Sequence, residues 1–158
     1  MKDTSFDEVA FFRAIAGSGA RALLIGRRAL VLLGLPVLTA DYDFWLHIDD
    51  VERFNAAAVA FDLAATHPPD EARRRGRYVL ENGEHMDVLI ARSVPTVGGV
   101  IVAFEDVWAR RQSVALSDTD VVALPSIPDL ILTKQFAARP KDLEDIRMLQ
   151  VLARRDGA

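Results

Sequence analysis

Cysteine is absent from this chain of 158 residues, and histidine occurs only three times. Without cysteine there is no disulfide framework, no thiol nucleophile and none of the usual structural zinc sites. The histidines lie far apart in the sequence, which leaves little to bind a transition metal. Any bound metal must therefore be held by carboxylates.

The chain also lacks a long hydrophobic run and a large excess of charge of either sign. No apolar stretch approaches the roughly 18 residues that span a membrane, and the start of the chain carries acids where a signal peptide is positive. We therefore expect a cytoplasmic protein with no membrane segment. The net charge of −4 argues against a surface built wholly to coat nucleic acid, so any contact with a polyanion must be local.

The remaining composition is that of an ordinary globular protein. Hydrophobic residues make up 51% of the chain and charged residues 27%, which is typical of a sequence that folds on its own. The length is close to the usual size of one domain. We therefore expect a single domain over residues 1–158.

The first part of the chain predicts helices and strands in alternation. Ser5 and Glu8 have the spacing of a capping box at the start of an amphipathic helix. An apolar run at 22–26 stops at a glycine and predicts a strand, which is followed by a tight turn and a helix over 27–33. Aromatic and β-branched residues at 41–48 predict a second strand.

The middle of the chain predicts a long helix and a hairpin. Two aspartates precede a helical pattern over 51–66, which two prolines end, and residues 70–75 then read as a polar loop. The dipeptide Asn-Gly at 82–83 stands between apolar runs at 77–80 and 85–90, which is a strong hairpin signal.

The last third of the chain predicts a small hairpin and two closing helices. Residues 95–104 have no clear pattern, 104–110 suggest helical turns, and 114–124 suggest a hairpin. A helix begins at Pro128, and after an Arg-Pro break a last helix covers 142–154. The predicted fold class is α/β (α+β), with a small mixed β-sheet flanked by helices and two helices at the C-terminal end.

Two acids, Asp41 and Asp43, stand two residues apart on the predicted strand over 41–48, so both lie on the same side of the sheet. Carboxylates held together repel one another unless they share a cation, and oxygen ligands favour Mg²⁺ or Mn²⁺. The same spacing of two acids occurs three more times in the chain. The pair alone therefore also fits two solvated acids at a strand end, and its aromatic and apolar surroundings set it apart from the other three.

Gly26 closes an apolar strand, and Thr39, Asp41 and Asp43 follow on the next strand. This arrangement resembles the signature of the nucleotidyltransferase superfamily, which has the polymerase-beta-like fold. In that family a glycine turn at a helix start cradles the triphosphate of an NTP, and the two acids hold magnesium. The resemblance implies these roles for Gly26 and for the two aspartates.

Asp87, on the second strand of the predicted hairpin, fits the third carboxylate that the same resemblance expects. It would complete the metal site and would accept the proton of the attacking hydroxyl as a general base. Simple alternation along a half-exposed strand also predicts a polar residue at this position.

Lys134, the pair Lys141-Asp142, and Asp145 resemble the ending of a short bacterial branch that includes the abortive-infection toxin nucleotidyltransferases. The resemblance implies that Lys134 contacts a phosphate, and that Asp142 and Asp145 fix Lys141 or the junction of the two last helices. A solvated helix face is the alternative interpretation.

Two positions depart from the family pattern. Arg27 stands where the family has a second small residue, and Val37 stands where it has an arginine. Arginine's side chain would block close approach of the backbone to a phosphate, or it would supply positive charge to the same group. A dense basic run, Arg73, Arg74, Arg75 and Arg77, adjoins two acids, and we interpret it as a solvated loop rather than a phosphate grip.

These observations favour a magnesium-dependent enzyme that transfers a nucleotidyl group from an NTP to a hydroxyl of RNA or protein. Its expected catalytic and metal-binding residues are Asp41, Asp43 and Asp87, and its expected nucleotide-binding residues are Gly26, Arg27 and Lys134. The alternative is a degenerate relative that keeps the fold and binds a nucleotide or a partner protein, such as the cognate antitoxin of a toxin-antitoxin pair. A structural domain without a ligand is the third hypothesis.

Overall fold

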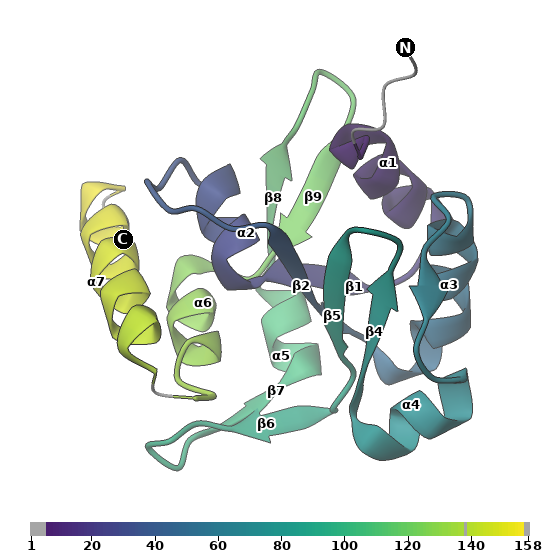
Figure 1. Cartoon of the computed structure of the whole chain (residues 1–158). Coiled ribbons are helices and arrows are strands. Elements are labelled where there is room, and N and C mark those ends of the chain that lie inside the picture. The colour runs from purple at the N-terminus through teal and green to yellow at the C-terminus, as the bar shows by residue number, and fades with distance from the viewer. Residues whose placement is uncertain (1–5, 138, 157–158) are drawn as a thin grey trace.

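The computed structural model describes residues 6–137 and 139–156, and a mixed sheet of five strands forms its centre (Figure 1). In spatial order the strands are β1 (Ala22–Ile25), β2 (Asp41–Leu46), β5 (His85–Leu89), β4 (Arg77–Glu81) and β3 (Ala64–Ala65). β2 and β5 are parallel, whereas every other pair of neighbours is antiparallel. The predicted α/β (α+β) class with a small mixed sheet is confirmed.

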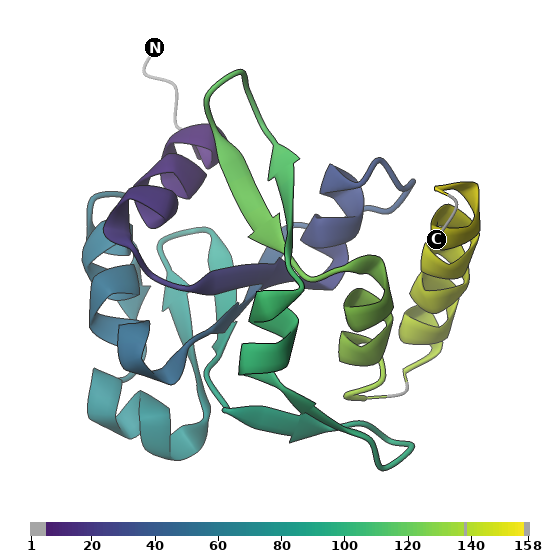
Figure 2. The same cartoon turned by 180° about the vertical axis from the view of Figure 1, so that it is seen from behind.

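Helices and two small hairpins surround the sheet. In Figure 1, α3 and α4 lie at one side of the sheet and α6 and α7 at the other, and Figure 2 shows α5 and the β8–β9 hairpin beside β1. The elements of the described residues outside the sheet are α1 (Glu8–Ser18), α2 (Gly26–Leu32), a short 3₁₀ helix (Ile48–Asp50), α3 (Val51–Val59), α4 (Pro69–Arg75), β6 (Ser93–Pro95), β7 (Ile101–Ala103), α5 (Phe104–Ala109), β8 (Gln112–Ala115), β9 (Val121–Leu124), α6 (Ile127–Thr133) and α7 (Pro140–Arg155).

The main hydrophobic core covers one face of the sheet. Alternate residues of β2, Tyr42 and Phe44, are buried on this face together with Phe11 and Phe12 of α1 and Phe54 of α3. Their rings meet edge-on or tilted, as aromatic rings prefer. This face leaves no room for a site, because helices α1 and α3 fill it.

A second, smaller core covers part of the opposite face. It buries Leu23 of β1 and Trp45 of β2 against Phe104 and Val107 of α5, and Phe136, which follows α6, packs on the tryptophan ring. The remaining part of this face carries the odd-numbered residues of β2 and β5, several of which are polar. The site must therefore lie where this second core ends.

Two predictions for the middle of the chain are wrong. The helix predicted over 51–66 stops at Val59, and Asp62 has a φ of +62°, a left-handed conformation that no helix continues through. Residues 70–75, predicted as a loop, lie in α4. Pro69 suits the first turn of that helix, acids at its start and arginines at its end complement the helix dipole, and Gly76 caps it with a φ of +80°.

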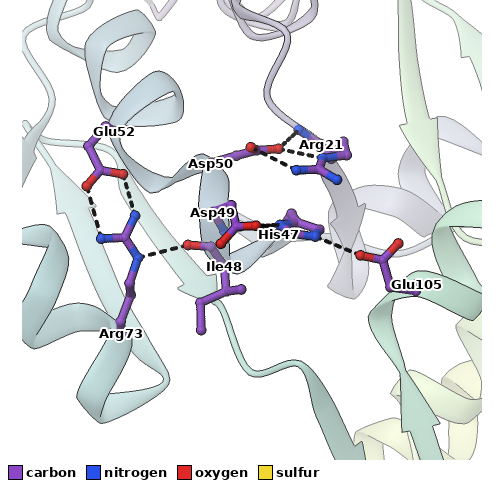
Figure 3. Close-up of polar contacts among 8 residues, drawn as sticks. All are labelled: Arg21, His47, Ile48, Asp49, Asp50, Glu52, Arg73 and Glu105. Carbon is purple, nitrogen blue, oxygen red and sulfur yellow. Dashed lines mark hydrogen bonds and ion pairs between the residues drawn. The ribbon is translucent and has the colours of Figure 1, made fainter.

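The basic run is not a solvated loop either. Figure 3 shows Arg73 directed from α4 toward the start of α3, where its guanidinium donates to Glu52 at 3.0 Å and to the carbonyl of Ile48 at 2.9 Å. Arg75 pairs with Glu71 within α4. Two of the four arginines therefore have structural partners.

Outcomes elsewhere are mixed. The hairpin about residues 82–83 and the hairpin over 114–124 are confirmed, and the unassigned segment forms the β6–β7 hairpin. The capping residue predicted at Ser5 lies outside the described residues, and Asp7 caps α1 by accepting a hydrogen bond from the N–H of Ala10. Within residues 6–137 and 139–156, no helix combines the length and the apolar character that a membrane crossing needs.

Candidate active site

The strand register brings two of the predicted acids side by side. Asp43 of β2 lies opposite Asp87 of the parallel strand β5, and Asp41 lies opposite His85. Neighbouring strands are about 4.8 Å apart, so the carboxylates of Asp43 and Asp87 leave the same face of the sheet as close neighbours. On the other side of β2, Asp43 is paired with Ile25, the residue before α2.

A cavity of about 360 Å³ opens over this pair of acids. Four of the predicted site residues line it, namely Gly26, Asp43, Asp87 and Lys134. Asp41 is exposed at the start of β2, two residues before Asp43, and neither it nor Arg27 belongs to the described residues that form the cavity wall. The cavity thus brings the predicted glycine, two acids and the lysine together.

The backbone at Gly26 lies close beside the side chain of Asp43. It is the first residue of α2 and has a φ of +70°, which glycine adopts more readily than other residues. A Cβ at this position would overlap Oδ2 of Asp43 and would lie 3.0 Å from Asp43 Cβ. The carboxylate beside it thus requires glycine here, whether or not a triphosphate also does.

The electrostatics of the cavity centre on Asp43. Burial raises the pKa of this carboxyl, and the neighbouring charges of Asp87 and Asp41 raise it further. The positive charges of Lys134 and Lys141 offset part of this effect. Burial and neighbouring negative charge therefore both disfavour the ionised form of Asp43, and a further cation in the cavity would stabilise it.

Asp145 of α7 holds both of the predicted phosphate-binding cations. Its side chain is fully buried, and its Oδ2 lies 2.9 Å from Nζ of Lys134. Arg27 donates from Nε and Nη2 to the same carboxylate, each at 3.2 Å. The arginine that replaces a small residue of the family pattern thus turns toward α7 and leaves the space beside Gly26 open.

Asp142 and Asp145 are both buried on α7, and they have different partners. Asp142 is buried and accepts a hydrogen bond of 2.9 Å from Nε of Arg139, just before α7. Lys141 is exposed at the start of that helix. Of the two predicted roles, Asp145 fits the helix junction, since it ties α7 to Lys134 at the end of α6, whereas Asp142 caps the start of its own helix.

Residues that the sequence reasoning did not place in the site include Arg139, which lines the cavity, together with Arg77 and His85. Arg77 of β4 lines the cavity, although it was grouped with the solvated basic run. His85 lies on the same face, and its Nε2 is 3.2 Å from Oδ2 of Asp87. The strand period offered a signal for His85 and Arg77. His85 stands two positions before Asp87 on β5, so the two side chains share a face. Arg77 stands two positions before Val79, the residue of β4 that lies opposite Asp87, so Arg77 shares that face too.

The donor set of the cavity fits a hard divalent cation that is shared with a substrate. In residues 6–137 and 139–156 no three His, Cys, Asp or Glu side chains form a ready-made metal site. Magnesium is commonly bound by one or two carboxylates together with substrate phosphates and water, rather than by a complete protein cage. Asp43 and Asp87 supply two such carboxylates, and the repulsion between them favours a shared cation.

Comparison with known proteins gives structural matches without sequence matches. No protein-family model and no curated protein matches the chain. The antibiotic-resistance factor ANT(2'')-Ia superimposes with a TM-score of 0.62 at 14% identity, over 89% of this chain and 78% of the other. The chain has a nucleotidyltransferase-like fold. TM1012 of Thermotoga maritima, a candidate nucleotidyltransferase by its name, superimposes with a TM-score of 0.54 at 12% identity, over 93% of this chain and 88% of the other.

Proposed function

We propose that the protein transfers a nucleotidyl group from an NTP to a hydroxyl of RNA or protein, with magnesium or manganese as its metal. The observation that carries this proposal is the pairing of Asp43 with Asp87 across β2 and β5, in one cavity with Gly26 and Lys134. The nucleotidyltransferase-like fold supports it, since the acids stand on that fold's central sheet.

In this proposal Asp43 and Asp87, with Asp41 beside them, would hold the metal, which would offset the negative charge of the phosphate oxygens of the NTP. Lys134 and the backbone at Gly26 orient the phosphates from the β1 side of the sheet. Asp87 accepts the proton of the attacking hydroxyl. The acceptor oxygen bonds to the α-phosphorus, and pyrophosphate leaves.

The experiment offers each of the four NTPs, labelled at the α-phosphate, to the protein with total RNA or with soluble cell protein, in Mg²⁺ or Mn²⁺. Label should enter one acceptor class and should disappear in Asp43→Asn and Asp87→Asn. Asp118→Asn is the matched control, because Asp118 belongs to another pair of acids two residues apart but is exposed beside β9. Labelling that survives in Asp43→Asn would remove these acids from the reaction.

The degenerate relative is the second candidate, and the ion pair of Arg27 with Asp145 bears on it. Were Arg27 an obstacle to phosphate binding, it would project into the cavity, and instead it lies behind the wall. If calorimetry finds NTP binding but no acceptor is labelled, the chain is a binder, and co-purification with a cognate antitoxin would then identify its partner.

A further inference from the structure

Three cationic side chains line the cavity, and two of them already have acid partners. Lys134 pairs with Asp145, and Arg139 pairs with Asp142. Among the residues that the structure describes, no carboxylate forms an ion pair with Arg77. An exposed guanidinium in a cavity without a counter-ion is suited to an anionic group of a ligand.

Arg77 and Gly26 lie on opposite sides of the paired acids. The sheet order β1-β2-β5-β4 places Gly26, at the end of β1, beside Asp43 and places Arg77, on β4, beyond Asp87. Arg77 is opposite Leu89, two residues from Asp87, so its Cα is about 8 Å from that of the proposed base by strand geometry. In-line transfer at phosphorus puts the attacking hydroxyl and the leaving pyrophosphate on opposite sides. If the NTP enters at Gly26, the acceptor enters past Arg77.

We propose that Arg77 binds a phosphate of the acceptor and that the acceptor is therefore the end of an RNA strand. This inference rests on the proposed function, because it takes the NTP to lie on the β1 side. An RNA end presents a hydroxyl with a phosphate one nucleotide away, and a guanidinium binds phosphate with two parallel hydrogen bonds. A protein acceptor has no anionic group at a fixed distance from its hydroxyl.

The charges around Arg77 support a local contact with RNA. The N–H of Ile90, just after β5, bonds to the carbonyl of Gly76 at 2.9 Å, so the chain leaving β5 lies against the start of β4. Arg92, two residues farther on, is exposed at the same end of the sheet, as is Arg74 at the end of α4. With a net charge of −4 the chain can contact a polyanion only at a local basic patch, and these arginines form one beside the cavity.

The test measures binding of a short single-stranded RNA with a free 3′ hydroxyl, by fluorescence anisotropy, across a series of salt concentrations. Arg77→Gln should weaken binding by about tenfold and should reduce the slope of log K against log salt by about 0.7, the value for one phosphate on a single strand. Arg75→Gln is the matched control, since Arg75 is an exposed arginine two residues away that already pairs with Glu71. It should leave affinity and slope close to those of the native protein.

Calorimetry with ATP in the same variants separates the acceptor side from the donor side. NTP affinity unchanged in Arg77→Gln, with RNA binding weakened, supports the proposal. NTP affinity weakened and the RNA salt slope unchanged would place Arg77 on the donor and overturn it. No RNA binding by the native protein, or transfer of label to protein alone, would overturn it too. RNA binding that depends on Arg77 without any nucleotidyl transfer would instead refute the proposed function and leave the RNA contact standing.

Discussion

Replacing Asp145 with asparagine should destabilise the fold strongly, because one buried carboxylate neutralises two cations. The Asp145 side chain is fully buried, and the Lys134 side chain beside it is 7% exposed, so Asp145→Asn leaves a buried ammonium without its ion-pair partner. Breaking a buried pair in this way costs about 3–5 kcal/mol. For a chain of this length that corresponds to a melting temperature lower by roughly 6–20 °C.

Thermal unfolding followed by circular dichroism measures this loss, and a second variant tests its cause. Asp145→Asn combined with Lys134→Met removes the uncompensated charge, and Arg27 is 26% exposed and can turn to solvent, so most of the loss should be recovered. Glu71→Gln breaks a pair on the surface and should cost less than about 0.5 kcal/mol. A melting temperature for Asp145→Asn within about 2 °C of the native value would refute the reasoning.

Three further predictions concern single residues. Asp43→Asn should raise the melting temperature at neutral pH, because the folded-state pKa of Asp43 is raised and the native chain therefore loses stability as pH rises through that pKa. Melting temperatures measured across pH should show the difference between the variant and the native chain widen above about pH 4. Addition of Mg²⁺ should narrow that difference. Gly26→Ala should lower the free energy of unfolding in urea by more than about 1 kcal/mol, because the φ of this residue is +70° and a Cβ there would displace the Asp43 carboxylate. Gly17→Ala is the control: Gly17 lies inside α1 with open space around it, so alanine there should stabilise the chain. Burial raises the pKa of Asp50, but hydrogen bonds from Arg21 (Figure 3) outweigh this effect and leave the pKa below its usual range. The pair therefore adds stability that is lost as pH falls below about 4. If the melting temperature of Asp50→Asn fell as steeply with pH in acid as that of the native chain, this prediction would be contradicted.

The sequence predicted which face of the sheet the acids would share because a strand has a strict period. A spacing of two residues put Asp41 and Asp43 on one face whatever the rest of the fold did, and the Asn-Gly turn placed Asp87 on a strand of its own. The period of two residues along a strand could not predict whether Asp41 or Asp43 would line the cavity. That depends on where the second core ends, and residues from α5 and the α6 region, far along the chain, determine it.

The errors have physical causes of the same kind. Helix α4 has a single buried residue, Ala72, so it lacks the apolar stripe by which a helix is recognised, and its arginines resembled a loop. The partner of Arg27 stands 118 positions later in the chain, on a helix whose docking no local pattern describes. Contacts between residues so far apart in the sequence can be identified only from the tertiary structure.

The attachment of α7 has a consequence for local stability. This helix buries the acids Asp142 and Asp145 and the apolar Leu149. Asp142 pairs within the start of the helix, so α7 is attached to the rest of the fold mainly by the ion pairs of Asp145 with Lys134 and Arg27. Burial protects the pair of Asp145 with Lys134 from screening by salt, but the helix has little apolar contact area beside it. The last helix should therefore open as a separate unit more readily than the central sheet, and its amides should exchange hydrogen for deuterium well before those of β2 and β5.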